Sequence, residues 1–328
     1  MKNRLYTLPE VKSYIESGAV CIISGHENLL KQLPKGNWIG ATISRFLDVD
    51  GGIISENKLF VVDLSNYISD FKIRLYNENQ ISDMLADGFD NGFLYVLMPM
   101  QSKVHMKYGT SAFMETDLFR NPVVGWIAGA CPNIVVVNGE TGEMSGSLAV
   151  AIHCQLPEDK KAHIEIVSPF VQGDGDTFVF TDYSFEVKDC YINGKLENML
   201  EYWKSNNIDA RLPLVSNMSG ALINVNLADF DEVNGIVNLG AAVIPGVKYK
   251  IAKQLPDYAG TFKANIPTET DSIVSSINCY ANFEYLELKG QKLGNLTGPF
   301  GHGEIAYLLL NQTTVNLYII NISDSHQP

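Results

Sequence analysis

The sequence is poor in basic residues and has no long apolar run. Its 328 residues include 24 Lys and Arg against 37 Asp and Glu, which gives a formal net charge of −13. This acidic excess repels phosphate backbones and anionic lipid surfaces, so we expect no nucleic-acid partner. No stretch approaches the roughly 18 to 20 apolar residues of a membrane span, and the first residues lack the apolar core of a signal peptide. We therefore expect a cytoplasmic protein with no membrane insertion.

Recognisable catalytic and metal-binding motifs are also missing. The cysteines are widely spaced and form no C-x-x-C pair, so we interpret them as small buried hydrophobes. The histidines show no i, i+4 metal-binding spacing. There is no G-x-S-x-G elbow, no Walker loop, and no G-x-G-x-x-G motif ahead of a helix. The sequence thus assigns no catalytic residue and no metal ligand, and it leaves the identity of any cofactor unknown.

Short apolar runs dominate what the sequence does contain. Apolar residues make up 46% of the chain, which is enough for a large buried core. Most of them fall in runs of four to eight residues bounded by turn residues, as strands do. Helical signals are fewer, and the clearest is a capping box formed by Thr7 and Glu10. The pattern predicts an α+β fold of two tightly packed strand-rich lobes, with mixed or antiparallel sheets covered by helices, one arrangement being α/β/β/α layers.

The division into lobes is expected near Asn193. There the strand pattern gives way to a helical stripe with i, i+3, i+4, i+7 spacing, formed by Leu196, Met199, Leu200 and Trp203. We therefore predict an N-terminal lobe over residues 1–192 and a C-terminal lobe over residues 193–328. The last third again has a strand pattern, including residues 275–288.

Five segments, in order, resemble successive parts of FIST-type sensory domains. They contain strands interrupted by Gly and small residues, and they are residues 22–44, 123–152, 184–206, 238–252 and 298–319. The resemblance implies a FIST-like lobe in each half and intracellular sensing of a small ligand, with a signalling partner. Because no kinase, cyclase or transmitter segment is present, it implies a stand-alone sensor or a component of an assembly. In the family the first Gly-rich strand carries Cys-Ser-Thr and an acidic residue. Here GNWIGATIS supplies Trp38 and Thr42, so a different ligand is expected.

The Gly-rich strands GNWIGA, VVGWIAGA and GPFGHGE predict a ligand pocket where the two lobes meet. Glycine lets a backbone approach a ligand closely, tryptophan supplies an apolar wall, and isolated polar residues fix polar groups. The predicted ligand-binding residues are Trp38, Gly40, Trp126, Gly298, Gly301, His302, Glu304 and Asn311.

Two other functions fit the same residues. A hydrolase or lyase would use His302 with Glu304 or with a cysteine, and would place a perturbed ionisable pair in a cleft. A scaffold or oligomer would instead expose an apolar patch. We favour the binding protein over the enzyme because no nucleophile signature is present.

Overall fold

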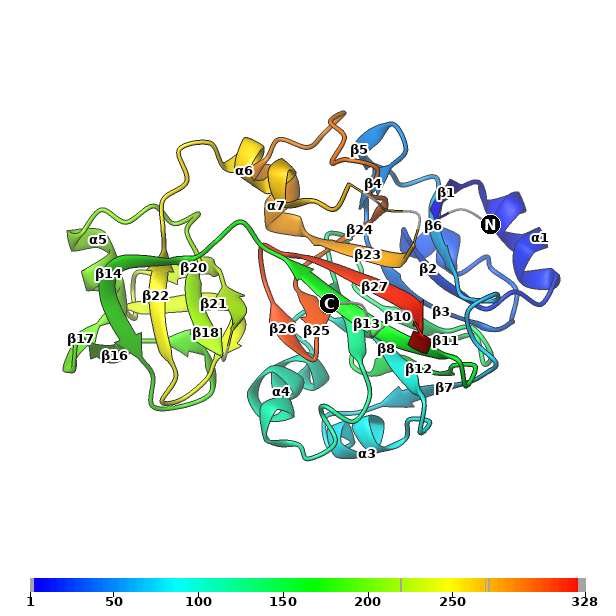
Figure 1. Cartoon of the computed structure of the whole chain (residues 1–328), viewed down its shortest axis with the longest axis horizontal. Helices are drawn as coiled ribbons and strands as arrows, with labels where there is room; N and C mark the ends of the chain where they lie inside the picture. Colours follow the sequence, from blue (N-terminus) through cyan, green and yellow to red (C-terminus); the bar gives the residue numbers. More distant parts are fainter. Residues whose placement is uncertain (1–2, 219, 269, 271, 324–328) are drawn as a thin grey trace.

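The chain folds into two strand-rich lobes (Figure 1). A computed structural model describes residues 3–323 except 219, 269 and 271. The large lobe comprises residues 3–168 and 256–323, and the small lobe comprises residues 172–252. Mixed and antiparallel sheets account for most of the ordered chain and helices are few, which confirms the predicted α+β class.

Three mixed sheets build the large lobe. Sheet 1 has the order β1 (Arg4–Tyr6), β6 (Leu59–Asp63), β2 (Cys21–Gly25), β3 (Trp38–Thr42), β10 (Val136–Asn138), β11 (Glu143–Ser145). Sheet 2 has the order β26 (Leu308–Leu310), β25 (Glu304–Ala306), β9 (Val123–Ala128), β8 (Gly92–Pro99), β12 (Ala149–Gln155), β7 (Asp70–Tyr76). Sheet 3 has the order β13 (Lys160–Val167), β27 (Thr314–Asn321), β23 (Ile273–Cys279), β24 (Gly298–Gly301), β4 (Arg45–Asp48), β5 (Gly51–Ile54).

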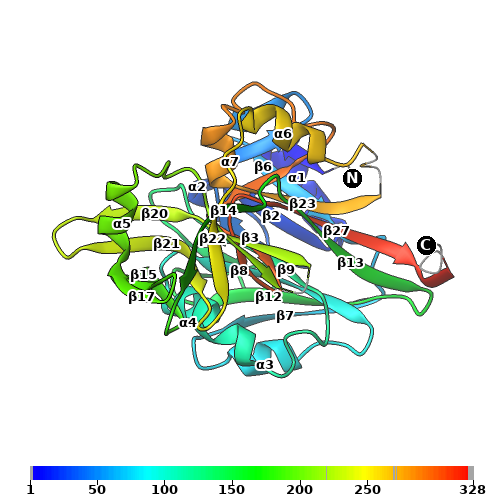
Figure 2. The same ribbon diagram turned by 60° about the vertical axis from the view of Figure 1, so that its left-hand side comes forward.

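Helices cover the outer faces of sheets 1 and 2. Figure 2 shows α6 and α7 at one edge of the large lobe and α3 and α4 at the opposite edge. The helices of this lobe are α1 (Leu8–Glu16), α2 (Glu27–Leu30), α3 (Ile81–Ala86), α4 (Lys103–Ser111) with the 3₁₀ turn η1 (Ala112–Met114), α6 (Tyr258–Asn265) and α7 (Tyr280–Tyr285). The predicted capping box is confirmed at the start of α1, where the backbone N–H of Thr7 donates to Glu10 at 2.7 Å. Among the described residues, no helix is long and apolar enough to cross a bilayer.

The apolar runs of the central strands are buried on both faces. Successive side chains of a strand point to opposite sides, so a strand between two layers needs apolar residues throughout. In β8, Tyr95 and Leu97 pack into the core between sheets 1 and 2, while Val96 and Met98 pack beneath α3 and α4. The helices α1 and α2 cover the outer face of sheet 1 in the same way. The large lobe therefore has the α/β/β/α layering that the sequence suggested.

Two antiparallel sheets and one helix form the small lobe. Sheet 4 has the order β17 (Lys195–Asn198), β16 (Asp189–Ile192), β14 (Gln172–Val179), β22 (Lys248–Ala252), β18 (Leu214–Met218), β19 (Ala221–Val225). Sheet 5 has the order β15 (Ser184–Val187), β21 (Ile236–Val243), β20 (Leu227–Asp231). The helix is α5 (Met199–Ser205). This lobe is inserted in the chain between β13 and α6, and both neighbours belong to the large lobe.

The lobe boundary predicted between residues 192 and 193 falls inside the small lobe. There β16 and β17 form a hairpin, and its two turn residues have positive φ angles, 50° at Asn193 and 84° at Gly194. An Asn-Gly pair in this conformation is typical of a tight hairpin turn. The change of pattern at Asn193 thus marks a turn within one sheet, and the predicted helix begins only at Met199.

The strand predicted over residues 275–288 is wrong in its second half. The strand β23 ends at Cys279 and α7 begins at Tyr280. A helical turn brings Phe283 and Leu286, three residues apart, to the same cluster, where they pack against Phe300. Tertiary packing thus outweighs the strand preference of the aromatic residues. This strand-to-helix junction forms part of the site described below.

Candidate functional site

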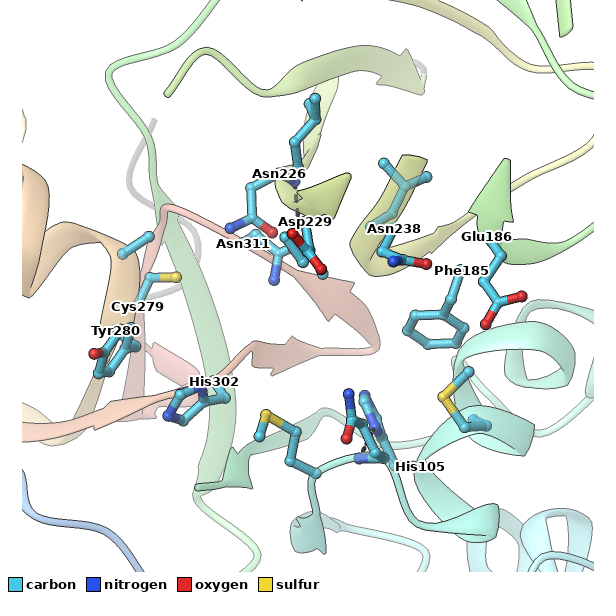
Figure 3. Close-up of a pocket in the computed structure, with 18 of the residues that line it drawn as sticks. His105, Phe185, Glu186, Asn226, Asp229, Asn238, Cys279, Tyr280, His302 and Asn311 are labelled. Carbon is cyan, nitrogen blue, oxygen red and sulfur yellow. Dashed lines mark hydrogen bonds between the residues drawn. The ribbon is translucent and has the colours of Figure 1, made fainter. Parts of the chain in front are cut away.

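A cavity of about 410 Å³ lies between the two lobes. Its walls come from the start of α4, from β15, β20 and β21 of the small lobe, and from α7 with the turn that precedes β25. Figure 3 shows Cys279, Tyr280 and His302 on one side of this space and Phe185 on the other. Its volume is in the range of small-molecule sites.

His105 faces the cavity with one ring nitrogen unpaired. Its Nδ1 accepts a hydrogen bond from the backbone N–H of Gln101 at 3.0 Å, so Nε2 carries the ring hydrogen. The side chain is 4% exposed, and Nε2 has no partner within the described part of the chain. Burial lowers the pKa of His105 to about 4, so the ring is neutral at pH 7. His105 therefore offers the cavity an N–H donor that has no partner among the described residues.

His302 is held by a ring stack at the opposite wall. Its ring lies 4.4 Å from that of Tyr280 with an interplanar angle of 19°. The Arg45 guanidinium lies 4.5 Å from the Tyr280 ring centroid and also pairs with Glu284 at 3.1 Å. Burial, and then the charge of Arg45, lower the pKa of His302 to about 4. This ring is therefore also neutral, and its buried Nε2 has no partner in the described structure.

Asn311 connects the two lobes at the upper rim of the cavity in Figure 3. Its backbone N–H donates to the carbonyl of Asn224 at 3.2 Å, and its Oδ1 accepts from the backbone N–H of Asn226 at 3.2 Å. The side-chain oxygen of Asn226 is buried without a donor in the part of the chain that is described. A Cβ on Gly240 would lie 1.9 Å from that oxygen, so glycine is required for this close contact.

Cys279 lies in the wall of the cavity, and Glu304 lies next to it behind that wall. The thiol lines the cavity, whereas Glu304 is fully buried. Oε2 of Glu304 accepts from the backbone N–H of Thr313 at 3.2 Å and from its hydroxyl at 2.7 Å. Burial raises the pKa of Glu304 to about 8, although the hydrogen bonds from Thr313 act in the opposite direction. Burial, and then the neighbouring Glu304, raise the pKa of the Cys279 thiol well above its usual value.

The charged side chains that line the cavity are all acidic. They are Glu186, Asp229 and Glu284, and no Lys or Arg is among the described residues of the lining. The two lining histidines are neutral because burial lowers the pKa of each to about 4. Arg45, which lies over the ring of the lining residue Tyr280, is paired with Glu284. With Glu284 paired, Glu186 and Asp229 still give the lining an excess of negative charge, which disfavours an anionic ligand.

The predicted site residues divide into two groups. His302 and Asn311 line the cavity, and Glu304 lies directly behind it. Trp38 and Gly40 lie elsewhere, in β3. The Trp38 ring packs under α1 and α2, and its Nε1 donates to the carbonyl of Pro34 at 3.0 Å. The structure therefore does not bring Trp38 together with His302.

The remaining predicted residues serve packing. Trp126 is fully buried in the core between sheets 1 and 2 and pairs in register with Glu304. Gly298 and Gly301 let β24 approach its neighbours closely. A Cβ on Gly298 would lie 1.9 Å from the carbonyl oxygen of Ser276, and one on Gly301 would lie 2.8 Å from the Cβ of Trp126. These glycines are needed for close packing of the strand against its neighbours, one of the known roles of glycine within a strand.

Several lining residues carry no sequence signal. His105 lies in an ordinary helix, Asn226 lies between β19 and β20, and Asn238 lies in β21 of the small lobe. Cys279 has the apolar neighbours of a core cysteine. The one available signal is its position directly before a short aromatic helix. The described residues contain no group of three or more His, Cys, Asp or Glu side chains that could hold a metal ion.

Fold and site together define an α+β protein with a ligand-sized cavity between two lobes. A family model described as a family of unknown function, DUF6976, matches residues 6–320, and the chain belongs to this family. No curated protein matches the chain. The resemblance to FIST-type sensory domains stays a prediction.

Proposed function

We propose that this protein binds a small molecule in the cavity between its lobes. The observation that carries the proposal is a set of buried polar atoms at this cavity that have no partner among the residues the structure describes, namely Nε2 of His105, Nε2 of His302 and Oδ1 of Asn226. A buried polar group without a partner costs about 1 to 3 kcal/mol. Three such atoms around one space are explained if a ligand supplies their partners.

The position of the cavity supports a sensing role. Its lining comes from α4 and α7 of the large lobe and from β15, β20 and β21 of the small lobe. A ligand that contacts both lobes favours one spacing between them, and a ligand shifts an equilibrium only through such differential contacts. This supports the proposal of a small-ligand sensor, with a signalling partner that would respond to the spacing.

Blocking the cavity is expected to abolish binding. Ala228 is exposed and lines the cavity, so Ala228→Trp would fill it without disturbing a core. Val233, 94% exposed in the same lobe and outside the lining, gives the matched control Val233→Trp. We would measure thermal unfolding with a set of small uncharged and cationic metabolites. A ligand at about 100 times its Kd stabilises the folded state by about 2.7 kcal/mol.

We expect the same stabilising compounds for the wild type and Val233→Trp, and none of them for Ala228→Trp. Equal stabilisation of all three proteins would place the binding site elsewhere and contradict the proposal. If no compound in the set stabilises the wild type, protein from its native host should be examined by native mass spectrometry. A small molecule retained by the wild type and lost from Ala228→Trp is then the expected result.

A further inference from the structure

Cys279 is placed where a reactive thiol would meet a ligand. It is the last residue of β23 and directly precedes α7, and among the described residues it is the only cysteine in the lining of the cavity. Its parallel partner in the sheet is Gly301, which precedes His302. The strand register therefore brings Cys279 beside the GPFGHGE segment singled out in the sequence.

A carboxyl group with a free oxygen lies beside this thiol. Glu304 is 0% exposed, and although Oε2 is bonded to Thr313, Oε1 has no partner in the described structure. Thr313 connects the two residues, because its carbonyl accepts from the backbone N–H of Cys279 at 3.3 Å while its own N–H and hydroxyl donate to Glu304. At this separation each group also changes the pKa of the other. A buried carboxyl with an unused oxygen is costly, and such groups are concentrated at functional sites.

Two backbone N–H groups lie near the sulfur, while burial and the neighbouring Glu304 keep Cys279 in its thiol form, so the thiol must lose its proton to a base before it can attack. The N–H groups of Gln312 and Ala281 both lie near the Cys279 sulfur and act to lower the pKa of the thiol, although burial raises it more. Gln312 is fully buried and has a φ of 54°, a left-handed conformation that is strained for a residue other than glycine. Strain of this kind is concentrated at functional sites.

From these contacts we infer that Cys279 is a nucleophile that attacks the carbonyl carbon of a small ester or amide bound in the cavity, and that Glu304 is the base that takes the thiol proton. This inference rests on the proposed function, because the substrate occupies the same cavity. It adds a covalent reaction to binding.

The reaction needs only water as a co-reactant. As the sulfur bonds to the carbonyl carbon, the thiol proton passes to the Glu304 carboxylate, and the C–O or C–N bond breaks as Glu304 returns that proton to the leaving alcohol or amine. Water then attacks the thioester while Glu304 takes a proton from it. The C–S bond breaks, the carboxylic acid leaves, and the proton returns to the sulfur.

The acidic lining selects the charge of the substrate. Glu186, Asp229 and Glu284 line the cavity, Glu284 in an ion pair with Arg45, and both lining histidines are neutral. An acyl phosphate or another anionic substrate would be repelled, so the substrate class is an uncharged or positively charged ester or amide.

The test uses the full chain and p-nitrophenyl acetate, an uncharged ester. We expect release of p-nitrophenolate together with an acetyl thioester that peptide mass spectrometry locates at Cys279. The rate should rise with pH to a midpoint near pH 8, because the pKa of Glu304 is raised to about 8 and only the carboxylate accepts a proton. Glu304→Gln should slow acetylation at least about 100-fold and remove this pH dependence.

Two matched controls separate this reaction from general thiol reactivity. Cys131 is half-buried and outside the cavity, so Cys131→Ala should leave the rate unchanged, whereas Cys279→Ala should abolish the thioester. The cationic reagent trimethylammonioethyl methanethiosulfonate should modify Cys279 at least about tenfold faster than the anionic sulfonatoethyl reagent. The double variant Glu186→Gln with Asp229→Asn should reduce that preference.

Release of p-nitrophenolate at the same rate by Cys279→Ala would overturn the inference. So would a wild-type rate with no midpoint near pH 8, a result that does not depend on whether Glu304→Gln folds. Binding is judged separately, on Cys279→Ala with the compounds that stabilise the wild type. If these still bind and no thioester ever forms at Cys279, the cavity remains the ligand site and only the reaction is refuted. If Ala228→Trp keeps their binding, the proposed function itself fails.

Discussion

Glu304→Gln should become more stable relative to the wild type as the pH rises from 5 to 8. The pKa of Glu304 is about 8 in the folded protein, against an ordinary value of 4.5. Above pH 4.5 the unfolded chain releases this proton while the folded protein keeps it, so the stability of the wild type falls as the pH rises toward 8. Glutamine cannot ionise and escapes this loss. Between pH 5 and pH 8 each pH unit changes the free energy of unfolding of the wild type by up to about 1.36 kcal/mol. Glu304→Gln should therefore gain about 4 kcal/mol in stability relative to the wild type across this range.

The measurement is urea unfolding of both proteins at pH 5, 6.5 and 8. Histidines whose pKa is lowered, such as His105 and His302, also change stability with pH, but they are common to both proteins and cancel in the difference. Glu158 is exposed and supplies the control Glu158→Gln. The free energy of unfolding of this control should differ from that of the wild type by nearly the same amount at all three pH values. If the stability difference between Glu304→Gln and the wild type is also independent of pH, Glu304 is not held protonated in the folded protein.

Gly298→Ala should destabilise the protein by at least about 3 kcal/mol or prevent it from folding. A Cβ at this position would lie 1.9 Å from the carbonyl oxygen of Ser276, a backbone atom of the neighbouring strand that no rotamer change can move away. Overpacking a core typically costs about 1 to 3 kcal/mol, and a rigid backbone contact is expected at or above that range. The strand β24 would have to separate from β23, which would also displace Cys279 from the cavity wall.

Soluble yield and thermal unfolding measure this effect. Gly175 is exposed, also lies in a strand, and has open space where a Cβ would be added, so Gly175→Ala is the matched control and should behave as the wild type does. If Gly298→Ala unfolds at the wild-type temperature, the close approach of the two strands is not a requirement of the fold. The first glycine of GPFGHGE would then not be needed for strand contact.

Local physical rules explain the parts of the fold that the sequence predicts correctly. The Thr7–Glu10 capping box starts α1 because its hydrogen bonds involve residues three apart. The continuous apolar run of β8 requires a layer on each face, which is what the α/β/β/α arrangement provides. These signals depend on neighbours in the chain and need no knowledge of the tertiary structure.

The lobe boundary and the site depend on contacts that local patterns do not encode. The Asn-Gly turn at Asn193 joins two strands of one sheet. Its residues alone do not distinguish such a hairpin turn from a boundary between two lobes. The cavity is formed by residues 100–106, 185–186, 226–240 and 279–311, which come together only after the small lobe packs on the large one. His302 and Asn311 are predictable because polar residues stand out in an apolar strand. His105 and Cys279 lack such contrast with their neighbours.

Amide hydrogen exchange with and without a stabilising compound tests most directly whether both lobes hold the ligand. A compound bound in the cavity should slow exchange in three regions at once, the start of α4, strands β20 and β21 of the small lobe, and α7. Slowed exchange confined to one lobe, or found only around Trp38 beneath α1 and α2, would contradict a site between the lobes.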